Sequence, residues 1–165
     1  MNLYAALAAG RSPTADVFTT LEDGRRLTYA DVEAGSARFA NALVALGVKP
    51  GDRVAVQAEK SIEAVMLYLG AVRAGAVFLP LNTAYTAAEV EYFLTDAEPA
   101  VFVCDPAAAD TLWPVAAKAG SRLETLGVGS RETPVQGTRA ETATAASGTF
   151  GTVARDDADL AAILY

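Results

Sequence analysis

The stretch RVAVQAEKSIEAVMLYLGAVRAGAVFLPLN, residues 53–82, decides the fold class. It opens with a short apolar strand pattern at residues 53–58, whose centre is apolar on both faces, as in a covered parallel sheet. A second apolar strand pattern follows at residues 77–81. Between them lies a helical pattern that Ser61 would cap and that would end near Gly75. A strand, a helix and a strand at this spacing predict a βαβ crossover.

A hairpin is expected before this stretch. Glu22-Asp23-Gly24 separates two short β-prone runs, at residues 17–21 and 25–28. Asp-Gly between such runs is typical of a β-hairpin.

Two capping boxes mark the starts of further helices. Thr28 with Asp31, and Thr86 with Glu89, each place a hydroxyl and a carboxylate three residues apart before an apolar helical pattern. We therefore expect one helix before the central stretch and another directly after it.

The alternation continues downstream. A strand is expected at residues 100–104, then a helix with Asp105 as N-cap, a proline at its first position and Gly120 at its end, and then a strand at residues 122–128. The sequence thus predicts an α/β fold: a mainly parallel, twisted sheet flanked by helices, with an N-terminal β-hairpin.

Three parts of the chain differ in composition. Residues 1–128 carry the α/β pattern and are expected to form one subdomain. Residues 129–158 are rich in Thr, Ala, Gly and Ser, which predicts an irregular excursion, with a short helix near residues 140–145. Residues 159–165 return to an apolar strand pattern.

Composition limits the function classes. The chain has 165 residues, of which 52% are hydrophobic, and a net charge of -7. An acidic surface disfavours nucleic acid and anionic membranes as partners, and no apolar run approaches the ~18 residues of a membrane helix. The absence of histidine excludes His-dependent triads and His metal sites. The single Cys104 cannot form an internal disulfide, which favours the cytoplasm.

Two groups of residues invite a phosphate-binding interpretation. Gly70 and Gly75 have loop-like spacing, but no Lys-Ser or Lys-Thr follows, so helix packing and C-capping are favoured. Glu59, Lys60 and Ser61 follow a parallel strand, where α/β proteins place ligands. Either Lys60 lies near a phosphate or CoA, or Ser61 caps a helix and both charges are solvated; we favour the second interpretation.

The remaining candidates are also expected to be structural. Asp156, Asp157 and Asp159 lack the spacing of a calcium loop, which favours a solvated acidic turn over a metal site. Packing in the core or at its rim is expected for four aromatic residues: Tyr4, Tyr85, Tyr92 and Trp113.

Several stretches resemble the adenylate-forming family of acyl-CoA ligases, luciferases and peptide-synthetase adenylation domains. They follow the order of that family: LTYADVEAGSARFANALVALGVKPGDRVAV (residues 27–56), AVMLYLGAVRAGAVFLPLN (64–82), TAAEVEYFLTDAEPAVFVCD (86–105) and DLAAILY (159–165). Within the family, VAVQAEKSIEAV (54–65) and AGAVFLPLNTAYTAAEVEYFL (74–94) are most similar to malonyl-CoA synthetases.

This resemblance implies a ligase that uses malonate, ATP, Mg²⁺ and CoA, within fatty acid metabolism. In the family, the last strand leads into a phosphate loop, so Ile163, Leu164 and Tyr165 would precede that loop. The family's catalytic lysine, nucleotide pocket and acid-binding residues lie downstream of the matched part. No catalytic, cofactor-binding or metal-binding residue is therefore expected within residues 1–165, and this chain alone is expected to be inactive.

Two other functions are compatible with these residues. One is a ligase for another short, medium or aryl carboxylic acid. The other is a non-catalytic module that keeps the same fold. The chain ends on the strand-like Ala-Ala-Ile-Leu-Tyr, which favours the N-terminal part of a larger enzyme, with the remainder as a companion chain or further segment.

Overall fold

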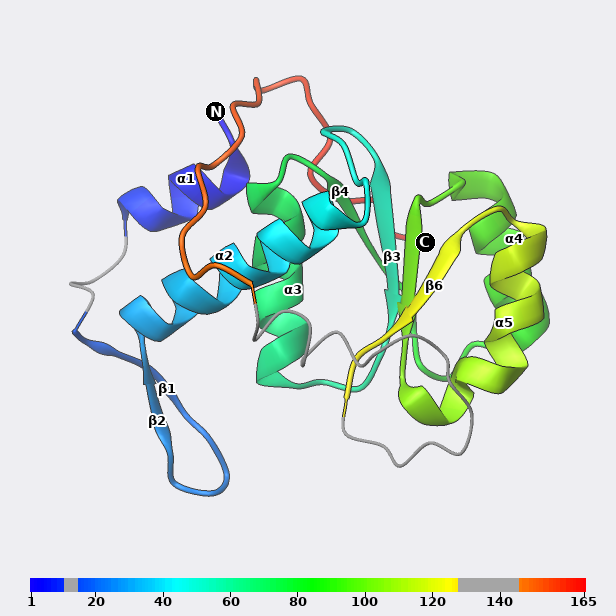
Figure 1. Ribbon diagram of the computed structural model, residues 1–165, viewed down its shortest axis with the longest axis horizontal. Coiled ribbons are helices and arrows are strands. Elements are labelled where there is room, and N and C mark those ends of the chain that lie inside the picture. Colours follow the sequence, from blue (N-terminus) through cyan, green and yellow to red (C-terminus); the bar gives the residue numbers. More distant parts are fainter. Residues whose placement is uncertain (11–14, 128–145) are drawn as a thin grey trace.

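The centre of the molecule is a parallel four-stranded sheet. In the computed structural model, which describes residues 1–10, 15–127 and 146–165, the strand order is β4-β3-β5-β6 (Figure 1). All three pairings are parallel. The strands are β3 (Arg53–Gln57), β4 (Val77–Pro80), β5 (Val101–Cys104) and β6 (Arg122–Thr125).

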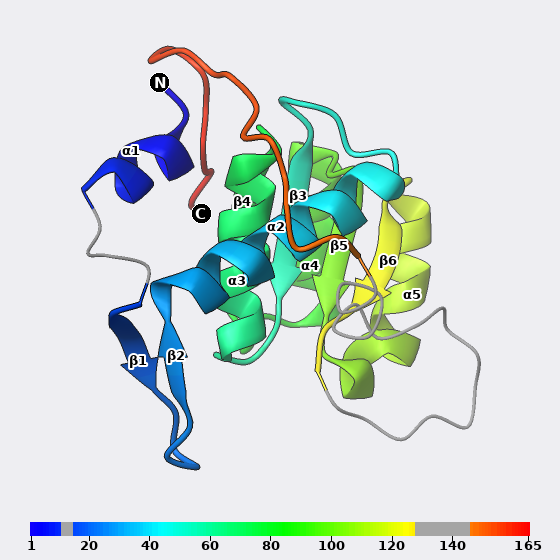
Figure 2. The same ribbon diagram turned by 60° about the vertical axis from the view of Figure 1, so that its left-hand side comes forward.

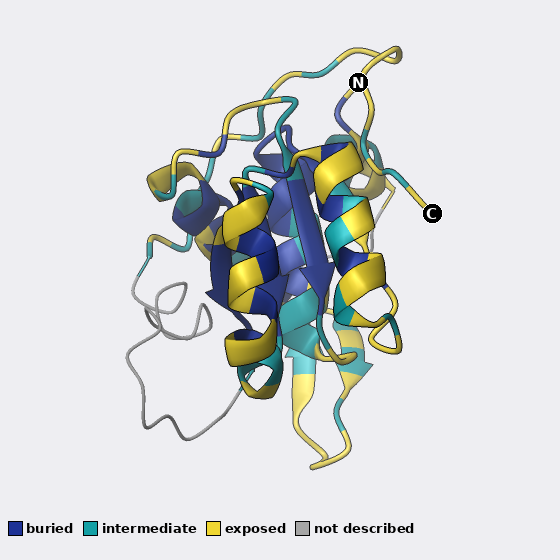
Figure 3. Ribbon diagram, turned by 90° about the vertical axis from the view of Figure 1, so that its right-hand side faces the viewer, coloured by how far each residue is buried: buried dark blue, intermediate teal, exposed yellow. Residues whose placement is uncertain are grey.

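Helices cover both faces of this sheet, as predicted. On one face lie α2 (Tyr29–Ala45) and α3 (Ile62–Arg73), and on the other α4 (Ala87–Ala97) and α5 (Ala109–Lys118). Figure 3 shows the outward faces of the helices exposed and the strands between them buried.

Alternation along each strand divides the core between the two faces. Val54 and Val56 of β3 pack with α2 and α3, whereas Ala55 packs with α4 and α5. Successive side chains of a strand point to opposite faces, so only a strand that is apolar at every position can serve two helical layers. The apolar residues at consecutive positions of β3 therefore pack against helices on both faces of the sheet, as the sequence predicts.

The predicted hairpin is present, with strands shorter than expected. It comprises β1 (Val17–Thr20) and β2 (Arg26–Thr28), which pair antiparallel. Gly24 has φ +82°, a conformation that L side chains rarely adopt, and its N–H donates to the Leu21 carbonyl at 2.9 Å. The hairpin projects from the start of α2 (Figure 2).

Both predicted capping boxes form. Thr28 and Thr86 each accept from the N3 backbone N–H, and Asp31 and Glu89 each accept from the backbone N–H of the capping threonine. These backbone bonds, with the threonine hydroxyl bonds, hold the pKa of both carboxyl groups below its usual range. Ser61 also caps α3, accepting from Ala64 N–H at 3.1 Å.

The prediction for Asp105 is correct for its position but not for the kind of helix. Asp105 is the N-cap of a short 3₁₀ turn (Pro106–Ala108) that begins with Pro106, whereas α5 begins only at Ala109, and the Asp105 side chain makes no capping hydrogen bond. Its two carboxylate oxygens instead accept from the Glu59 N–H, each at 3.2 Å. The Asp105 carboxylate thus binds a distant backbone N–H rather than one in the following turn, because the ends of β3 and β5 lie side by side in the sheet.

One helix was not predicted. The helix α1 (Leu3–Ala9) is capped by Asn2, whose side-chain oxygen accepts from Tyr4 N–H at 2.8 Å. It packs beside α3 at the edge of the molecule (Figure 1).

The C-terminal part returns across α2 and α3 without regular structure. Residues 146–159 lie along these helices, and the final residues reach β4 (Figure 2). The predicted helix at residues 140–145 and the end of the predicted strand at Val128 lie outside the described residues. In place of a full strand at residues 159–165, the structure has a single parallel bridge between Phe78 and Ala162.

Candidate functional site

The carboxyl ends of the parallel strands are the place where an α/β sheet of this kind presents ligand-binding groups. At the end of β3, the buried Gln57 side chain donates to the carbonyls of Asn82 (2.9 Å) and Tyr85 (3.1 Å). Gln57 therefore fixes the loop between β4 and α4 onto the end of β3.

The Glu59-Lys60-Ser61 group behaves as the favoured interpretation predicts. Ser61 caps α3, and both charged side chains are exposed. Lys60 makes no hydrogen bond or ion pair with any other residue that the structure describes.

Tyr165 lies in an aromatic cluster of four residues, Tyr85, Tyr92, Phe93 and Tyr165. Phe93 is central: its ring lies 4.7 Å from Tyr165, 4.9 Å from Tyr85 and 5.5 Å from Tyr92, between centroids. The Tyr165 hydroxyl donates to the Asp96 carboxylate. That bond, together with partial burial, raises the pKa of Tyr165 to about 12.

Ile163 and Leu164 have opposite surroundings. Ile163 packs against the core between the sheet and α4, and its N–H donates to the Phe78 carbonyl at 3.0 Å. Leu164 is 78% exposed. The last three residues are thus held by one backbone bond, one apolar contact and the Tyr165 contacts.

Gly70 and Gly75 serve packing and capping, as favoured from the sequence. A Cβ on Gly70 would lie 2.7 Å from Phe39 Cβ, so this glycine lets α3 approach α2 closely. Gly75 has φ +76° just after α3 and connects it to β4.

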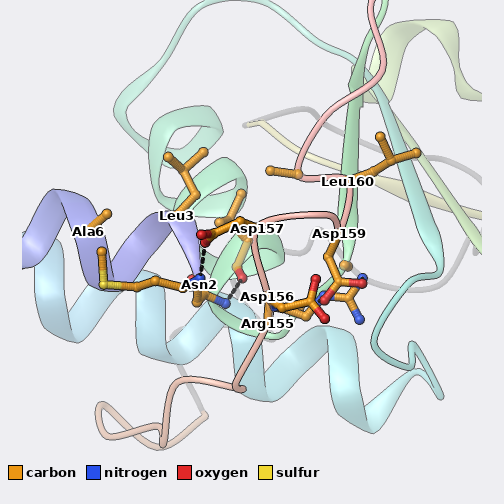
Figure 4. Close-up of a pocket in the computed structure, with 13 residues that line it drawn as sticks. Asn2, Leu3, Ala6, Arg155, Asp156, Asp157, Asp159 and Leu160 are labelled. Atoms are coloured by element: carbon orange, nitrogen blue, oxygen red, sulfur yellow. Dashed lines mark hydrogen bonds and ion pairs between the residues drawn. The ribbon is translucent and has the colours of Figure 1, made fainter.

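The three aspartates lie in a turn beside a surface cavity of about 300 Å³, between α1, the end of α3 and residues 155–161 (Figure 4). Asp159 pairs with Arg155 at 3.1 Å. Asp157 pairs with the amino group of Met1 at 2.6 Å, which lowers the Asp157 pKa. Among the described residues, no three His, Cys, Asp or Glu side chains are grouped to hold a metal ion.

The predicted aromatic positions divide. Tyr4 is buried and Tyr85 is partly buried, whereas Tyr92 and Trp113 are 65% and 52% exposed. The Tyr92 ring contacts that of Phe93 on α4, whereas Trp113 lies on α5.

Sequence reasoning did not single out Arg73, Asn2 or Gln57. All three are buried polar side chains that donate to main-chain carbonyls. In the sequence, these residues stand out only as polar residues within apolar patterns. Such a pattern does not indicate which carbonyl each side chain binds.

These observations define a class: an α/β domain with a two-faced parallel sheet, whose irregular C-terminal segment returns to the β4 edge. The chain matches the sequence model of AMP-binding enzymes over residues 6–165 and belongs to that family. No helix within the described residues is both long and apolar enough for a membrane span.

Solved structures of acyl-CoA ligases share the fold. MatB from Rhodopseudomonas palustris, a malonyl-CoA synthetase, is 48% identical over 99% of this chain and 32% of its own, with a TM-score of 0.91. A benzoate CoA ligase from Burkholderia xenovorans LB400 is 25% identical over 98% of this chain and 32% of its own, with a TM-score of 0.82.

Curated relatives carry other substrate names. The long-chain-fatty-acid–CoA ligase FadD13 of Mycobacterium tuberculosis is 40% identical over 85 residues, which are 52% of this chain and 17% of the relative. A feruloyl-CoA synthase from Amycolatopsis is 40% identical over 100 residues, 61% of this chain and 20% of the relative. The chain thus spans a third or less of these proteins.

Proposed function

We propose that this chain forms the N-terminal part of an AMP-forming acyl-CoA ligase. In such a ligase a carboxylate oxygen attacks the α-phosphate of ATP, and pyrophosphate leaves. The CoA thiol then attacks the carbonyl carbon of the acyl-adenylate, and AMP leaves. The observation that carries the proposal is the likeness to MatB along 99% of the chain.

The proposed carboxylic acid is malonate. The 48% identity to MatB extends over nearly the whole chain, whereas the 40% identities to the fatty-acid and feruloyl enzymes cover 52% and 61% of it. The benzoate ligase shares only 25%. The rival is a ligase for another short, medium or aryl acid.

The proposed role of residues 1–165 is to build and orient the site rather than to react. An ATP-bound MatB structure matches this chain with a TM-score of 0.90, which supports ATP as the nucleotide. Residues 163–165 would lead into the phosphate loop, whose backbone N–H groups cradle phosphates in this family. ATP, Mg²⁺ and CoA would be held beyond this part, with Mg²⁺ neutralising charge on the phosphates.

The proposed organisation keeps three parts, with 1–128 as the α/β subdomain, 129–158 as the excursion and 159–165 as the approach to the loop. The single cysteine and the small phosphorylated substrates support a cytoplasmic location.

The test is ATP–pyrophosphate exchange by the gene product at its natural length. Malonate, acetate, benzoate, ferulate and a long-chain fatty acid are supplied separately. Exchange that is fastest with malonate supports the proposal. Faster exchange with another acid would keep the proposed ligase activity but show that malonate is not the preferred acid. No exchange with any acid would overturn the ligase and support a non-catalytic module.

A further inference from the structure

We propose that Arg73 is a positioning residue that fixes the returning segment, residues 146–163, and thereby sets the register of its last part beside β4. This inference rests on the proposed ligase function, because that register places the approach to the phosphate loop. Arg73 does not contact the reacting groups in this account; it acts through the segment that it holds.

Arg73 is buried at the end of α3, with 5% of its surface exposed. One terminal nitrogen of its guanidinium donates to the Glu33 carbonyl (2.8 Å) and to the Ser36 hydroxyl (3.0 Å), both on α2. The guanidinium carbon also lies 4.5 Å from the centre of the Tyr4 ring. A buried guanidinium is costly unless it is paired, so these contacts fix its position closely.

The other terminal nitrogen of Arg73 reaches the returning segment. It donates to the Phe150 carbonyl at 2.9 Å, and the Arg73 carbonyl accepts from the Val153 N–H at 2.9 Å. One residue thus holds the segment at two points. The Asn2 side chain adds a third contact, since it donates to both the Val72 and the Val153 carbonyls, at 2.8 and 2.9 Å.

The turn between α3 and β4 also contacts the returning segment. A Cβ on Gly75 would lie 3.1 Å from Val153 and 3.2 Å from Arg155, so the segment lies tightly against this turn. Three residues further along, Phe78 donates to the Ala161 carbonyl (2.9 Å) and accepts from Ile163 N–H (3.0 Å).

Few contacts set this register. The segment forms only one bridge with β4 among the described residues, so no extended ladder of hydrogen bonds opposes a slip. The anchor at Arg73 and the bridge at Phe78 belong to one short stretch of chain. Loosening the anchor is therefore expected to free the bridge.

The experiment compares Arg73→Met and Arg73→Lys in the gene product at its natural length. The first readout is amide hydrogen exchange at Val153 and Ile163, which donate the bonds described above. The second is the KM for ATP and kcat. Ser121→Ala is the control, because it removes a buried bond to the Pro99 carbonyl (2.7 Å), beside the starts of β5 and β6 and away from the β4 edge.

We expect Arg73→Met to speed exchange at both amides and to lower kcat/KM for ATP about tenfold, since ~1 Å of misplacement can cost up to ~100-fold in rate. Arg73→Lys should restore part of each effect, because lysine keeps a charge and one point of donation. Ser121→Ala should lower the melting temperature without either effect.

A second variant covers the case in which Arg73→Met does not fold. Asn41 donates to the Ser147 and Thr149 carbonyls from the half-buried side of α2, at 3.0 and 2.9 Å. Asn41→Ala should give smaller changes in the same direction. Unchanged exchange at Ile163 in every folded variant would overturn the inference. If the unaltered protein shows no ATP–pyrophosphate exchange, the proposed ligase function is overturned instead. The amide hydrogen exchange at Ile163 would still test the role of Arg73.

Discussion

The hydroxyl of Tyr165 donates a hydrogen bond to the carboxylate of Asp96, a residue 69 positions earlier in the chain. The Tyr165 ring also lies 4.7 Å from that of Phe93 on the same helix, α4. These two contacts join residue 165, which follows the returning segment, to the helical layer opposite α2 and α3. The position of residue 165 therefore depends on α4 as well as on β4.

The first prediction concerns the titration of Tyr165. Its pKa is raised from 10.0 to about 12, chiefly by the bond to Asp96, because the neutral hydroxyl is the donor. The stabilisation is therefore fully present below pH 10 and is lost as the pH rises through 12. Asp96→Asn should bring the tyrosine with the highest pKa back toward the ordinary value, measured by phenolate absorbance as the pH rises. Tyr165→Phe should remove the absorbance change with the highest pKa. If that change persists in Tyr165→Phe, it does not belong to Tyr165.

The second prediction concerns the capping box of α4. The lowered pKa of Glu89 means that its charged form is stabilised in the folded protein. That contribution is present above the ordinary value of 4.5 and disappears as the pH falls through the lower folded pKa. Glu89→Gln should therefore melt at a lower temperature than the unaltered protein at neutral pH, and the difference should vanish in acid. A difference that does not depend on pH would contradict this origin.

The third prediction concerns the close approach of α2 and α3. A Cβ on Gly70 would meet the backbone of Ala40 and Ser36 at 2.9 Å, so neither neighbour can move aside without shifting the helix. Gly70→Ala should lower the free energy of unfolding by about 1–3 kcal/mol, the usual range for overpacking, measured by urea titration. Gly10→Ala is the matched control, because nothing lies within 4 Å of its Cβ. Equal effects of the two substitutions would show that packing at Gly70 is not tight.

The fourth prediction concerns residues 1–165 in isolation. Leu160 and Leu164 are 62% and 78% exposed beside the β4 edge, and such a surface favours association. This piece should self-associate in size-exclusion chromatography with light scattering, and Leu160→Ser with Leu164→Ser should reduce the association. It should also give only background ATP–pyrophosphate exchange. A monodisperse monomer with a sharp thermal transition would indicate an autonomous domain.

Local signals in the sequence predicted the elements well. The sheet could be predicted because β3 is apolar at consecutive positions, and the starts of α2 and α4 because Thr28 and Thr86 have carboxylates three residues on. In each case the cause lies within a few residues.

The site depends on long-range contacts that leave no such local signal. Arg73 donates to the Phe150 carbonyl 77 positions away, and Asn2 to the Val153 carbonyl 151 positions away. Their acceptors are main-chain oxygens, which every residue carries, so no pattern of side chains reveals them. The partner of the Asp105 side chain could not be predicted for a similar reason, because it is the main-chain N–H of Glu59, 46 positions earlier.

Competition between acids decides whether the complete protein is a ligase for malonate. The gene product at its natural length is incubated with ATP, Mg²⁺, CoA and equal concentrations of malonate, acetate, benzoate, ferulate and a long-chain fatty acid. Mass spectrometry of the thioesters then reports the ratio of kcat/KM values. We expect malonyl-CoA to be the dominant product. Another dominant thioester, or none, would contradict it.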